Sequence, residues 1–289
     1  MFFLVVSYLL LELMKKVLIT GGSSFLGRNV IENFTDFQFT ALINEQKLNY
    51  KNVENIKLDS YSQINEIIEM ENFDYVFHFA SQRHVSDDLK SIDEYIKVNI
   101  KFGVTILQAL KKSNIKLFIY SSSLWQDLLG EQKNLYTLSK QHFDDYLKYF
   151  SIESKFNILS LRIGDQYGKN DLRNKIIPYI KNNENNEKIE FNSNGEHLLS
   201  LVHIADILKA IESKLSNSES KKYEILRLCS HPITIKEFIE IYKKTREKTF
   251  TPIYGQLSND LYQKEDFIER VRENIWLNTV DIVDGLKSL

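Results

Sequence analysis

The chain has 289 residues, of which 43% are hydrophobic and 26% charged, a globular composition that excludes a disordered or fibrous protein. Its 37 Lys and Arg nearly balance its 39 Asp and Glu, so the charge does not favour nucleic acid or an anionic membrane surface as a partner. The only cysteine, Cys229, excludes an internal disulfide and a multi-cysteine zinc site, and the six histidines show no metal-ligand spacing. We therefore expect a cytoplasmic protein of one large or two modest domains, without a metal.

The N-terminal segment 1–13 is set apart by its composition. Residues 1–11 are almost wholly apolar, but the run is shorter than the roughly 20 residues that span a bilayer. It also lacks the basic start and the cleavage site of a secretory signal. Because Met14 directly precedes the first predicted strand, we interpret residues 1–13 as an N-terminal extension and expect no stable membrane association.

Short apolar runs alternate with amphipathic segments over the first 165 residues. The runs predict strands at 17–20, 39–43, 75–79, 117–120 and 158–161, and the amphipathic segments predict helices at 25–34, 61–70, 91–110 and 136–150. Continuous apolar strands that alternate with helices favour an α/β fold with a parallel sheet.

The turn between the first strand and the first helix has the spacing of a phosphate-binding turn. Gly21 permits the tight turn, Gly27 permits close packing of the helix on the sheet, and Ser24 takes the place of the middle glycine. N–H groups at the helix start can then hold a pyrophosphate. The sequence thus predicts a Rossmann-type doubly wound sheet, although a glycine turn without a ligand stays open as an alternative.

The end of the second strand bears on the choice between NAD and NADP. An acidic residue there would bind the ribose 2′-hydroxyl of NAD. Asn44 is neutral and Lys47 could meet a 2′-phosphate, whereas Glu45 favours NAD. We expect NAD(P), with a slight preference for NADP(H); the alternative for Lys47 is a solvated loop charge.

The regular alternation of apolar runs and amphipathic segments ends after about residue 162. A polar stretch at 181–188 predicts an exposed loop, and shorter elements follow, with helices at 203–213 and 234–244. We therefore expect a dinucleotide-binding domain over 14–165, with a return segment near 200–225. A smaller α/β domain over 166–289 would bind the substrate.

Tyr136 and Lys140 lie four residues apart and would share one face of a helix. A phenol has an ordinary pKa of about 10, too high for efficient proton transfer near neutral pH, and a cation one turn away stabilises the phenolate. Hydroxyls at 121–123 end the strand before this helix, where they could bond a substrate carbonyl. A surface aromatic–cation pair and a polar turn are the alternatives.

Several further segments occur in a fixed order along the chain. They are His78–Val85, Asn99 with Gly103, Leu161-Arg162 leading to Tyr167-Gly168, and Leu201–Asp206. Together with the glycine turn and the Tyr136/Lys140 pair, they resemble the extended short-chain dehydrogenase/reductase family, of the NAD-dependent epimerase/dehydratase type that acts on nucleotide sugars. The resemblance covers roughly residues 15–208.

This resemblance implies roles for individual residues. Ser123 would hold and polarise the sugar hydroxyl or ketone, Tyr136 would transfer the proton, and Lys140 would lower the pKa of Tyr136 and bind the nicotinamide ribose. The other expected cofactor contacts are Gly21, Ser24, Phe25, Leu26, Asn44, Asp59 (at the adenine), Phe79, Ala80, Ser81, Arg83 and Asn99. The expected substrate contacts are Gln82, Ser123, Trp125, Asp165 and Arg173.

Departures from the family pattern narrow the expected reaction. Sugar 4,6-dehydratases of the family carry an Asp-Glu pair just after the serine or threonine, where this chain has Leu124-Trp125. Asp127 and Glu131 lie nearby, but dehydration is not expected. The run 123–126, Ser-Leu-Trp-Gln, is similar to the 4-ketoreductase branch, such as CDP-abequose synthase. Asp165 stands where many members have an Asn that contacts the diphosphate, so a cation such as Arg173 would have to intervene.

Three hypotheses follow. The first is an NAD(P)-dependent reductase of a 4-keto deoxy nucleotide sugar in bacterial surface polysaccharide or glycan biosynthesis. The second is a nucleotide-sugar 4-epimerase with tightly bound NAD, and the third is a non-catalytic dinucleotide sensor. The helices at 91–110 and 136–150 resemble the pair that forms a four-helix bundle in dimers of the family, so we expect a homodimer, with ordinary packing on the sheet as the alternative.

Overall fold

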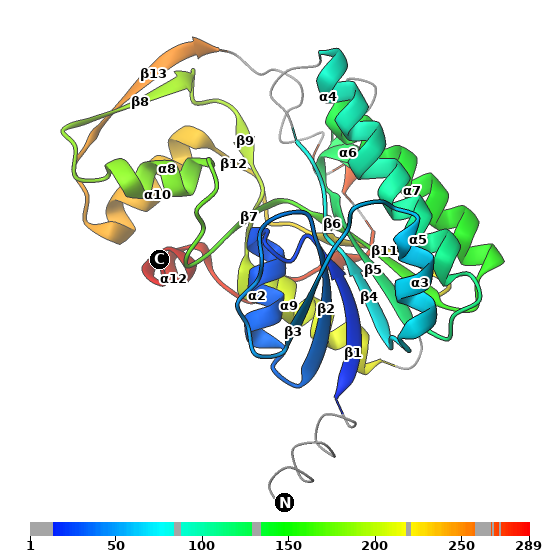
Figure 1. Cartoon of the computed structure of the whole chain (residues 1–289). Helices are drawn as coiled ribbons and strands as arrows, with labels where there is room; N and C mark the ends of the chain where they lie inside the picture. The colour runs from blue at the N-terminus through cyan, green and yellow to red at the C-terminus, as the bar shows by residue number, and fades with distance from the viewer. Residues whose placement is uncertain are drawn as a thin grey trace, which may run out of the picture. The chain divides into compact units, whose positions relative to one another are not determined.

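A computed structural model describes residues 14–83, 88–128, 134–217, 221–257, 267, 269–271 and 273–289 (Figure 1). The chain divides into two compact units. The first holds residues 1–122, 134–161 and 214–225, and the second holds 123–133, 162–213 and 226–289. The functional division at residue 165 stays a prediction, because it depends on where the cofactor and the substrate bind.

A parallel sheet of eight strands confirms the expected fold class. Its order is β14-β11-β6-β5-β4-β1-β2-β3. The strands are β1 (Lys15–Thr20), β2 (Phe37–Ile43), β3 (Val53–Lys57), β4 (Tyr75–His78), β5 (Leu117–Ser123), β6 (Asn157–Ile163), β11 (Tyr223–Leu228) and β14 (Ile275–Trp276). The first strand after the turn, β2, pairs with β1 in parallel, as does β4 on its other side. The carboxyl ends of these strands therefore meet at one edge, where α/β sheets bind ligands.

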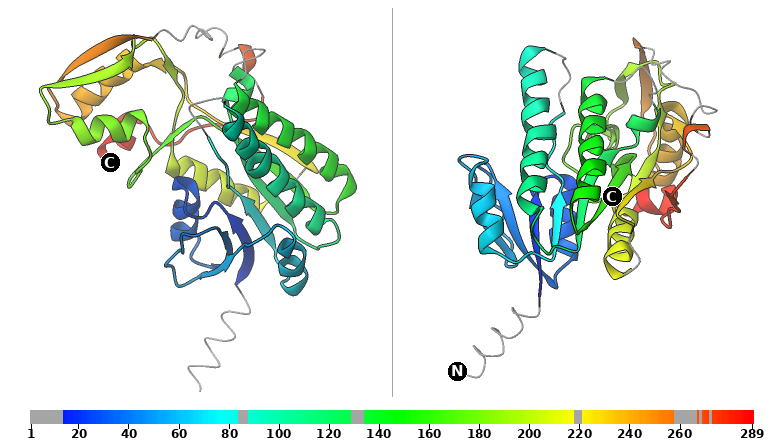
Figure 2. Two further views of the ribbon diagram at one scale, coloured as in Figure 1. Left: turned by 45° about the horizontal axis from the view of Figure 1, so that its top comes forward. Right: turned by 90° about the vertical axis from the view of Figure 1, so that its right-hand side faces the viewer.

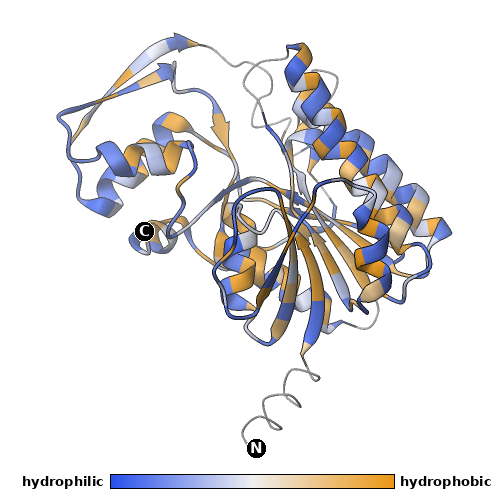
Figure 3. Cartoon of the chain, in the orientation of Figure 1, coloured by the Kyte–Doolittle hydropathy of each residue, from blue (hydrophilic) through white to orange (hydrophobic). Residues whose placement is uncertain are grey.

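Helices cover both faces of the sheet in the first unit. Its helices are α2 (Phe25–Asn33), α3 (Gln63–Met70), α4 (Leu89–Glu94), the π-helix η1 (Tyr95–Phe102), α5 (Gly103–Leu110) and α7 (Leu135–Glu153). Figure 1 shows α2 on one side and α3, α5 and α7 on the other, and the central strands are the most hydrophobic part of this unit (Figure 3). Leu18, Val76 and Phe118 pack with Leu107 and Leu147 in one buried cluster.

The helix expected at 91–110 is a composite of three segments. The chain runs from α4 through η1 into α5, and Figure 2 shows this composite helix lying alongside α7, with which η1 makes many contacts. π-Helical turns are rare and occur often at functional sites. Asn99 lies within η1, and the structure therefore places one expected site residue on the irregular part of the helix.

The second unit is built from short elements around its own core. They are α6 (Trp125–Leu128), β7 (Asp165–Tyr167), α8 (Ile176–Asn183), β8 (Lys188–Ser193), β9 (Leu198–Leu199), β10 (Leu201–His203), α9 (Ile204–Ser216), β12 (Ile233–Thr234), α10 (Ile235–Arg246), β13 (Thr251–Leu257) and α12 (Ile282–Lys287). The expected loop at 181–188 is wrong at its start, because α8 continues to Asn183 and buries Ile177 and Ile180. The predicted α10 is confirmed, and Thr234 with Glu237 forms a capping box at its start.

Two searches were negative for the part of the chain that the structure describes. No helix there is both long enough and apolar enough to cross a bilayer. In the same residues, no group of three His, Cys, Asp or Glu side chains is arranged to hold a metal ion.

Candidate active site

The turn between β1 and α2 has the close backbone packing that a phosphate-binding turn needs. Gly21 has a φ of +69°, and a Cβ there would lie 2.5 Å from the Ala80 nitrogen. A Cβ on Gly27 would lie 2.3 Å from the Gly21 carbonyl oxygen. Ser24 is the N-cap of α2, and its hydroxyl accepts the Gly27 N–H at 3.0 Å. The Phe25 and Leu26 side chains are buried, so the contacts expected of these two residues would be made by their main-chain N–H groups.

A buried contact joins the ends of β1 and β4 beside this turn. The Thr20 hydroxyl accepts the Ala80 N–H at 3.2 Å and lies 2.8 Å from Nδ1 of His78. Burial lowers the pKa of His78 to about 3, so its ring is neutral at physiological pH. A buried neutral ring that bonds Thr20 links the two strands, which is a structural role for His78.

Asn99 joins three segments of the first unit. Its Oδ1 accepts the Gln82 N–H at 2.7 Å and the Ser81 hydroxyl at 3.3 Å. Its Nδ2 donates to the Gln82 carbonyl at 3.0 Å and to the Ser139 hydroxyl at 2.9 Å. Since an amide has two acceptor and two donor positions, all four are used. The Asn99 side chain, only 1% exposed, therefore positions the segment after β4, and its expected cofactor contact stays a prediction.

Tyr136 lies in the first turn of α7, directly after the N-cap Asn134. Partial burial raises the pKa of Tyr136 above its usual value, whereas the Arg83 guanidinium and a hydrogen bond with Ser81 act in the opposite direction. The Arg83 Cζ lies 5.8 Å from the centre of the Tyr136 ring. Arg83 is thus a cation that favours the phenolate, and the expected effect of Lys140 on the pKa of Tyr136 stays a prediction.

Lys140 is buried one turn further along α7. Its Nζ donates a hydrogen bond of 2.8 Å to the Ser121 carbonyl and lies 5.9 Å from the centre of the Tyr136 ring. Burial lowers the pKa of Lys140 to about 7, and the buried Asp144 carboxylate partly opposes this. The ammonium group is therefore partly deprotonated near neutral pH.

Ser123 ends β5 and is held by the short helix that follows it. The Ser123 N–H donates to Oε1 of Gln126 at 3.0 Å, and the Ser123 hydroxyl accepts the Trp125 N–H at 3.4 Å. Because the hydroxyl oxygen accepts here, its proton is available for a carbonyl oxygen of a ligand. The partly buried Trp125 packs beside a hydrophobic cluster, with its ring centre 5.7 Å from that of His197.

Asp127 is engaged in a buried network of ion pairs. Its carboxylate pairs with Arg162 and, at 2.9 Å, with Nε of Arg227. The Asp127 side chain is 11% exposed and that of Arg162 7%. Asp127 is therefore tied to two arginines of the second unit rather than directed at a ligand. Glu131, the other acidic residue expected nearby, lies outside the described residues, as do His84 and Val85.

The expected diphosphate contacts lie in two separate groups of interactions. Oδ2 of Asp165 accepts the Ser200 N–H at 3.0 Å, which ties β7 to the start of β10. The Arg173 guanidinium makes two hydrogen bonds of 2.7 Å to Asp171 and a third to the Gln166 carbonyl. Arg173 is thus directed by Asp171, which the sequence analysis did not consider.

The remaining expected residues lie at strand ends of the first unit. Asn44 is exposed directly after β2, with Glu45 and Lys47, and Asp59 is exposed after β3. Phe79 is buried after β4, and its N–H donates to the Thr20 carbonyl at 3.1 Å. The structure therefore brings together Ser81, Gln82, Arg83, Asn99, Tyr136 and Lys140 in the first unit, and Ser123, Trp125 and Gln126 in the second.

His203 and Cys229 have structural surroundings that explain their presence in the chain. His203 accepts the Ala205 N–H at 3.3 Å through Nδ1 and so caps the start of α9. Cys229 is buried after β11, and burial raises the pKa of its thiol to about 11. A thiol with so high a pKa is a poor nucleophile.

Comparison with known proteins identifies the class. Residues 17–229 match the family described as NAD dependent epimerase/dehydratase family, and the chain belongs to this family. The mouse (Mus musculus) dTDP-D-glucose 4,6-dehydratase is 26% identical over 278 residues, which cover 85% of this chain and 78% of that protein. CDP-abequose synthase of Salmonella muenchen is 24% identical over 258 residues, with 86% and 87% covered.

A solved structure shows the same fold. UDP-glucuronic acid 4-epimerase from Bacillus cereus, in complex with UDP-glucuronic acid and NAD, has a TM-score of 0.75 at 15% identity, and the match covers 94% of this chain and 97% of that one. The family is NAD-dependent, and the similar proteins are named for reactions of nucleotide sugars.

Proposed function

We propose that the protein is an NAD(P)-dependent reductase of a 4-keto deoxy nucleotide sugar, in bacterial surface polysaccharide or glycan biosynthesis. The observation that carries this proposal is the environment of α6. Dehydration needs an acid and a base beside the sugar, yet the two residues after Ser123 are Leu124, which is fully buried, and Trp125. The one described carboxylate on α6, Asp127, is held by two arginines. Proton transfer is thus left to Tyr136.

The chemistry follows from these side chains. The Ser123 hydroxyl would donate a hydrogen bond to the ketone oxygen, and Tyr136 would give that oxygen its phenolic proton as the carbonyl becomes an alcohol. When bound, the reduced nicotinamide supplies the hydride that the carbonyl carbon accepts. Lys140, with a pKa of about 7, can return a proton to the phenolate near neutral pH.

The test is an absorbance assay of reduced nicotinamide. Purified protein is mixed with NADH or NADPH and a panel of 4-keto-6-deoxy nucleotide sugars made in situ. We expect absorbance to fall with one sugar, and to fall faster with NADPH, because Lys47 is exposed at the end of β2 where a 2′-phosphate would lie. No fall with any sugar would contradict a reductase.

A 4-epimerase is the second candidate, supported by the fold shared with a UDP-glucuronic acid 4-epimerase. A 4-epimerase needs the same tyrosine and serine as the reductase, and like the reductase it needs no acid for dehydration. This enzyme would interconvert two sugars with no net change in nicotinamide absorbance. Chromatography of the nucleotide sugars after incubation with NAD separates the two reactions, because only an epimerase forms product without consuming a reduced cofactor.

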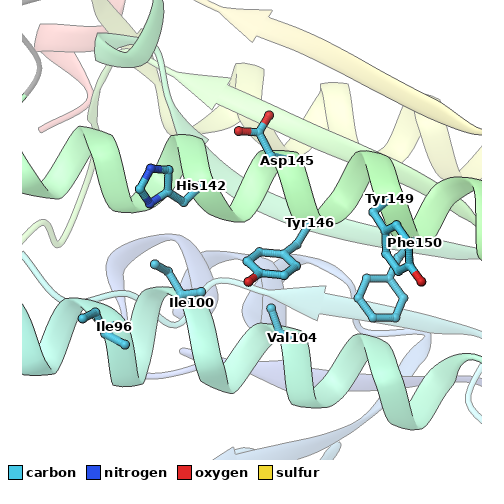
Figure 4. A pocket seen from close by; sticks show the side chains of 8 residues that line it. All are labelled: Ile96, Ile100, Val104, His142, Asp145, Tyr146, Tyr149 and Phe150. Carbon is cyan, nitrogen blue, oxygen red and sulfur yellow. The ribbon is translucent and has the colours of Figure 1, made fainter.

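We also propose that the protein is a homodimer through the groove between the composite helix η1–α5 and α7. The groove has a volume of about 760 Å³, and Figure 4 shows Ile96, Ile100 and Val104 on one side with Tyr146 opposite. Ile96, Tyr146 and Tyr149 are 53%, 44% and 54% exposed, which is unusual for apolar side chains so close together. A second copy offers the same pair of helices, and two such pairs can pack as a four-helix bundle.

Light scattering coupled to size-exclusion chromatography tests this interface. The wild-type protein should elute at twice the mass of one chain. Tyr146→Asp should elute as a monomer, because it places a charge in the groove, whereas Tyr179→Asp, at an exposed position of the second unit, should not change the mass. A monomeric wild-type protein would rule the proposal out.

A further inference from the structure

Two cations lie at nearly the same distance from the Tyr136 ring. The Arg83 Cζ is 5.8 Å from the ring centre, and the Lys140 Nζ is 5.9 Å from it. They come from different segments, Arg83 from the residues after β4 and Lys140 from α7. We propose that Arg83 is a positioning residue of the proton-transfer site, a second cation that stabilises the Tyr136 phenolate independently of Lys140.

The two cations differ in how their charge depends on pH. A guanidinium stays charged at every pH at which a protein is folded. Lys140 is 2% exposed, its Nζ is bonded to a neutral carbonyl, and burial lowers its pKa to about 7. Above neutral pH the lasting positive charge near the phenol is therefore that of Arg83.

The segment that carries Arg83 is held in place by the buried amide of Asn99. This amide bonds both the N–H and the carbonyl of Gln82, the residue before Arg83. Ser81, one residue earlier, donates its hydroxyl proton to the Asn99 Oδ1 at 3.3 Å. A side chain on a backbone fixed at two points loses less entropy when it stays near its partner.

The other groups that face Tyr136 do not replace this charge. Tyr95 of η1, with its ring centre 6.4 Å away, raises the pKa of Tyr136. Tyr120 of β5 couples electrostatically to Tyr136 as well, and its own pKa is raised well above the usual value by burial. Among the groups that act on this phenol, Arg83 and the hydroxyl of Ser81 are those that favour the phenolate.

A single fluorinated tyrosine at position 136 provides the direct test. Difluorotyrosine is more acidic than tyrosine, so its titration by fluorine NMR takes place where the protein stays folded. Replacing Arg83→Gln should move this titration to higher pH by about one pH unit. Arg83→Lys should restore most of the difference. Lys101→Gln, which removes an equal charge from an exposed position of η1, should leave the titration unchanged.

The outcome is independent of the proposed reaction, because the titration needs neither substrate nor cofactor. If Arg83→Gln titrates at the same pH as Lys101→Gln, the proposal is wrong. If the reductase assay succeeds, a second readout applies and rests on the proposed function. The alkaline limb of the pH profile for reduction, where Tyr136 loses its proton, should move to higher pH in Arg83→Gln. A residue that only held the cofactor would raise KM and leave this limb in place.

Discussion

The Asn99 amide nitrogen donates a hydrogen bond of 2.9 Å to the Ser139 hydroxyl, and this contact ties the π-helix η1 to α7. Ser139 in turn donates to the Tyr136 carbonyl at 2.7 Å. The position of Tyr136 is therefore linked, through these two hydrogen bonds, to the residue that also holds the segment 81–82. Such networks stabilise a single arrangement only while every member is bonded.

Asn99→Ala should destabilise the protein markedly. The change leaves the Gln82 N–H and carbonyl without their side-chain partner and removes the donor to Ser139, and we expect the free energy of unfolding to fall by about 2–3 kcal/mol. Urea denaturation measures it. Asn33→Ala is the matched control, since Asn33 makes one exposed bond, to the Asn29 carbonyl. Equal stability of the two variants would contradict the role given to Asn99.

Gly103→Ala should also destabilise the protein, for a steric reason. A Cβ at position 103 would lie 2.3 Å from Cζ of Phe143 and 2.8 Å from Nε2 of His78. Overpacking of this kind costs about 1–3 kcal/mol. In a Phe143→Leu background the same change should cost less than half as much, because leucine leaves room for the new methyl group. Thermal unfolding of the four proteins in the cycle measures the coupling, and additive effects would show that Phe143 is not the obstacle.

The sequence predicted those parts of the fold that depend on local patterns. The apolar runs and the glycine turn located β1, β2, β4, β5 and the parallel sheet. Strand β3 was missed, because it has no fully buried residue and carries Glu54, Asn55 and Lys57. Its place is set by pairing with β2, which no local pattern records. The π-helix was missed for a similar reason, since Asn99 and Gly103 fix it through contacts with other segments.

The site was predictable by residue type and less so by electrostatics. Tyr136, Lys140 and Ser123 could be named from their motifs. The charge of Lys140 could not be predicted, because its burial, and not its spacing from Tyr136, sets its pKa. The network of Asp127 with Arg162 and Arg227 joins residues 100 positions apart in the sequence. Arg227 belongs to none of the motifs, and the sequence offered no signal that would have found it.

Lys140 should make the stability of the protein depend on pH. Its pKa is about 7 when folded and near 10.5 when unfolded, so the unfolded chain binds more protons between these values and stability rises with pH. The free energy of unfolding, relative to that of Lys140→Met, should increase by about 2 kcal/mol from pH 7 to pH 9. Urea denaturation of both proteins at each pH measures the difference. A flat or falling difference would mean that Lys140 stays charged when buried.

Asp127→Asn separates a structural role from a catalytic one. Loss of the carboxylate removes its ion pairs with the nearly buried Arg162 and Arg227, and we expect the free energy of unfolding to fall by about 3 kcal/mol. Turnover per folded molecule should stay close to that of the wild type in an assay at low temperature. If Asp127 were a dehydration acid, the reverse would be seen, with stability kept and turnover lost.

Tyr136→Phe should abolish the reaction and leave cofactor binding intact. Without the phenolic proton, the oxygen of the reduced carbonyl has no donor, and kcat should fall by about 100-fold or more. The glycine turn is unchanged, so quenching of protein fluorescence by NADPH should give the same Kd. Tyr149→Phe, at a position of α7 that is 54% exposed, is the matched control. A fully active Tyr136→Phe protein would remove Tyr136 from the mechanism, whereas a wild-type protein that binds NADPH and turns over no sugar would favour the dinucleotide sensor.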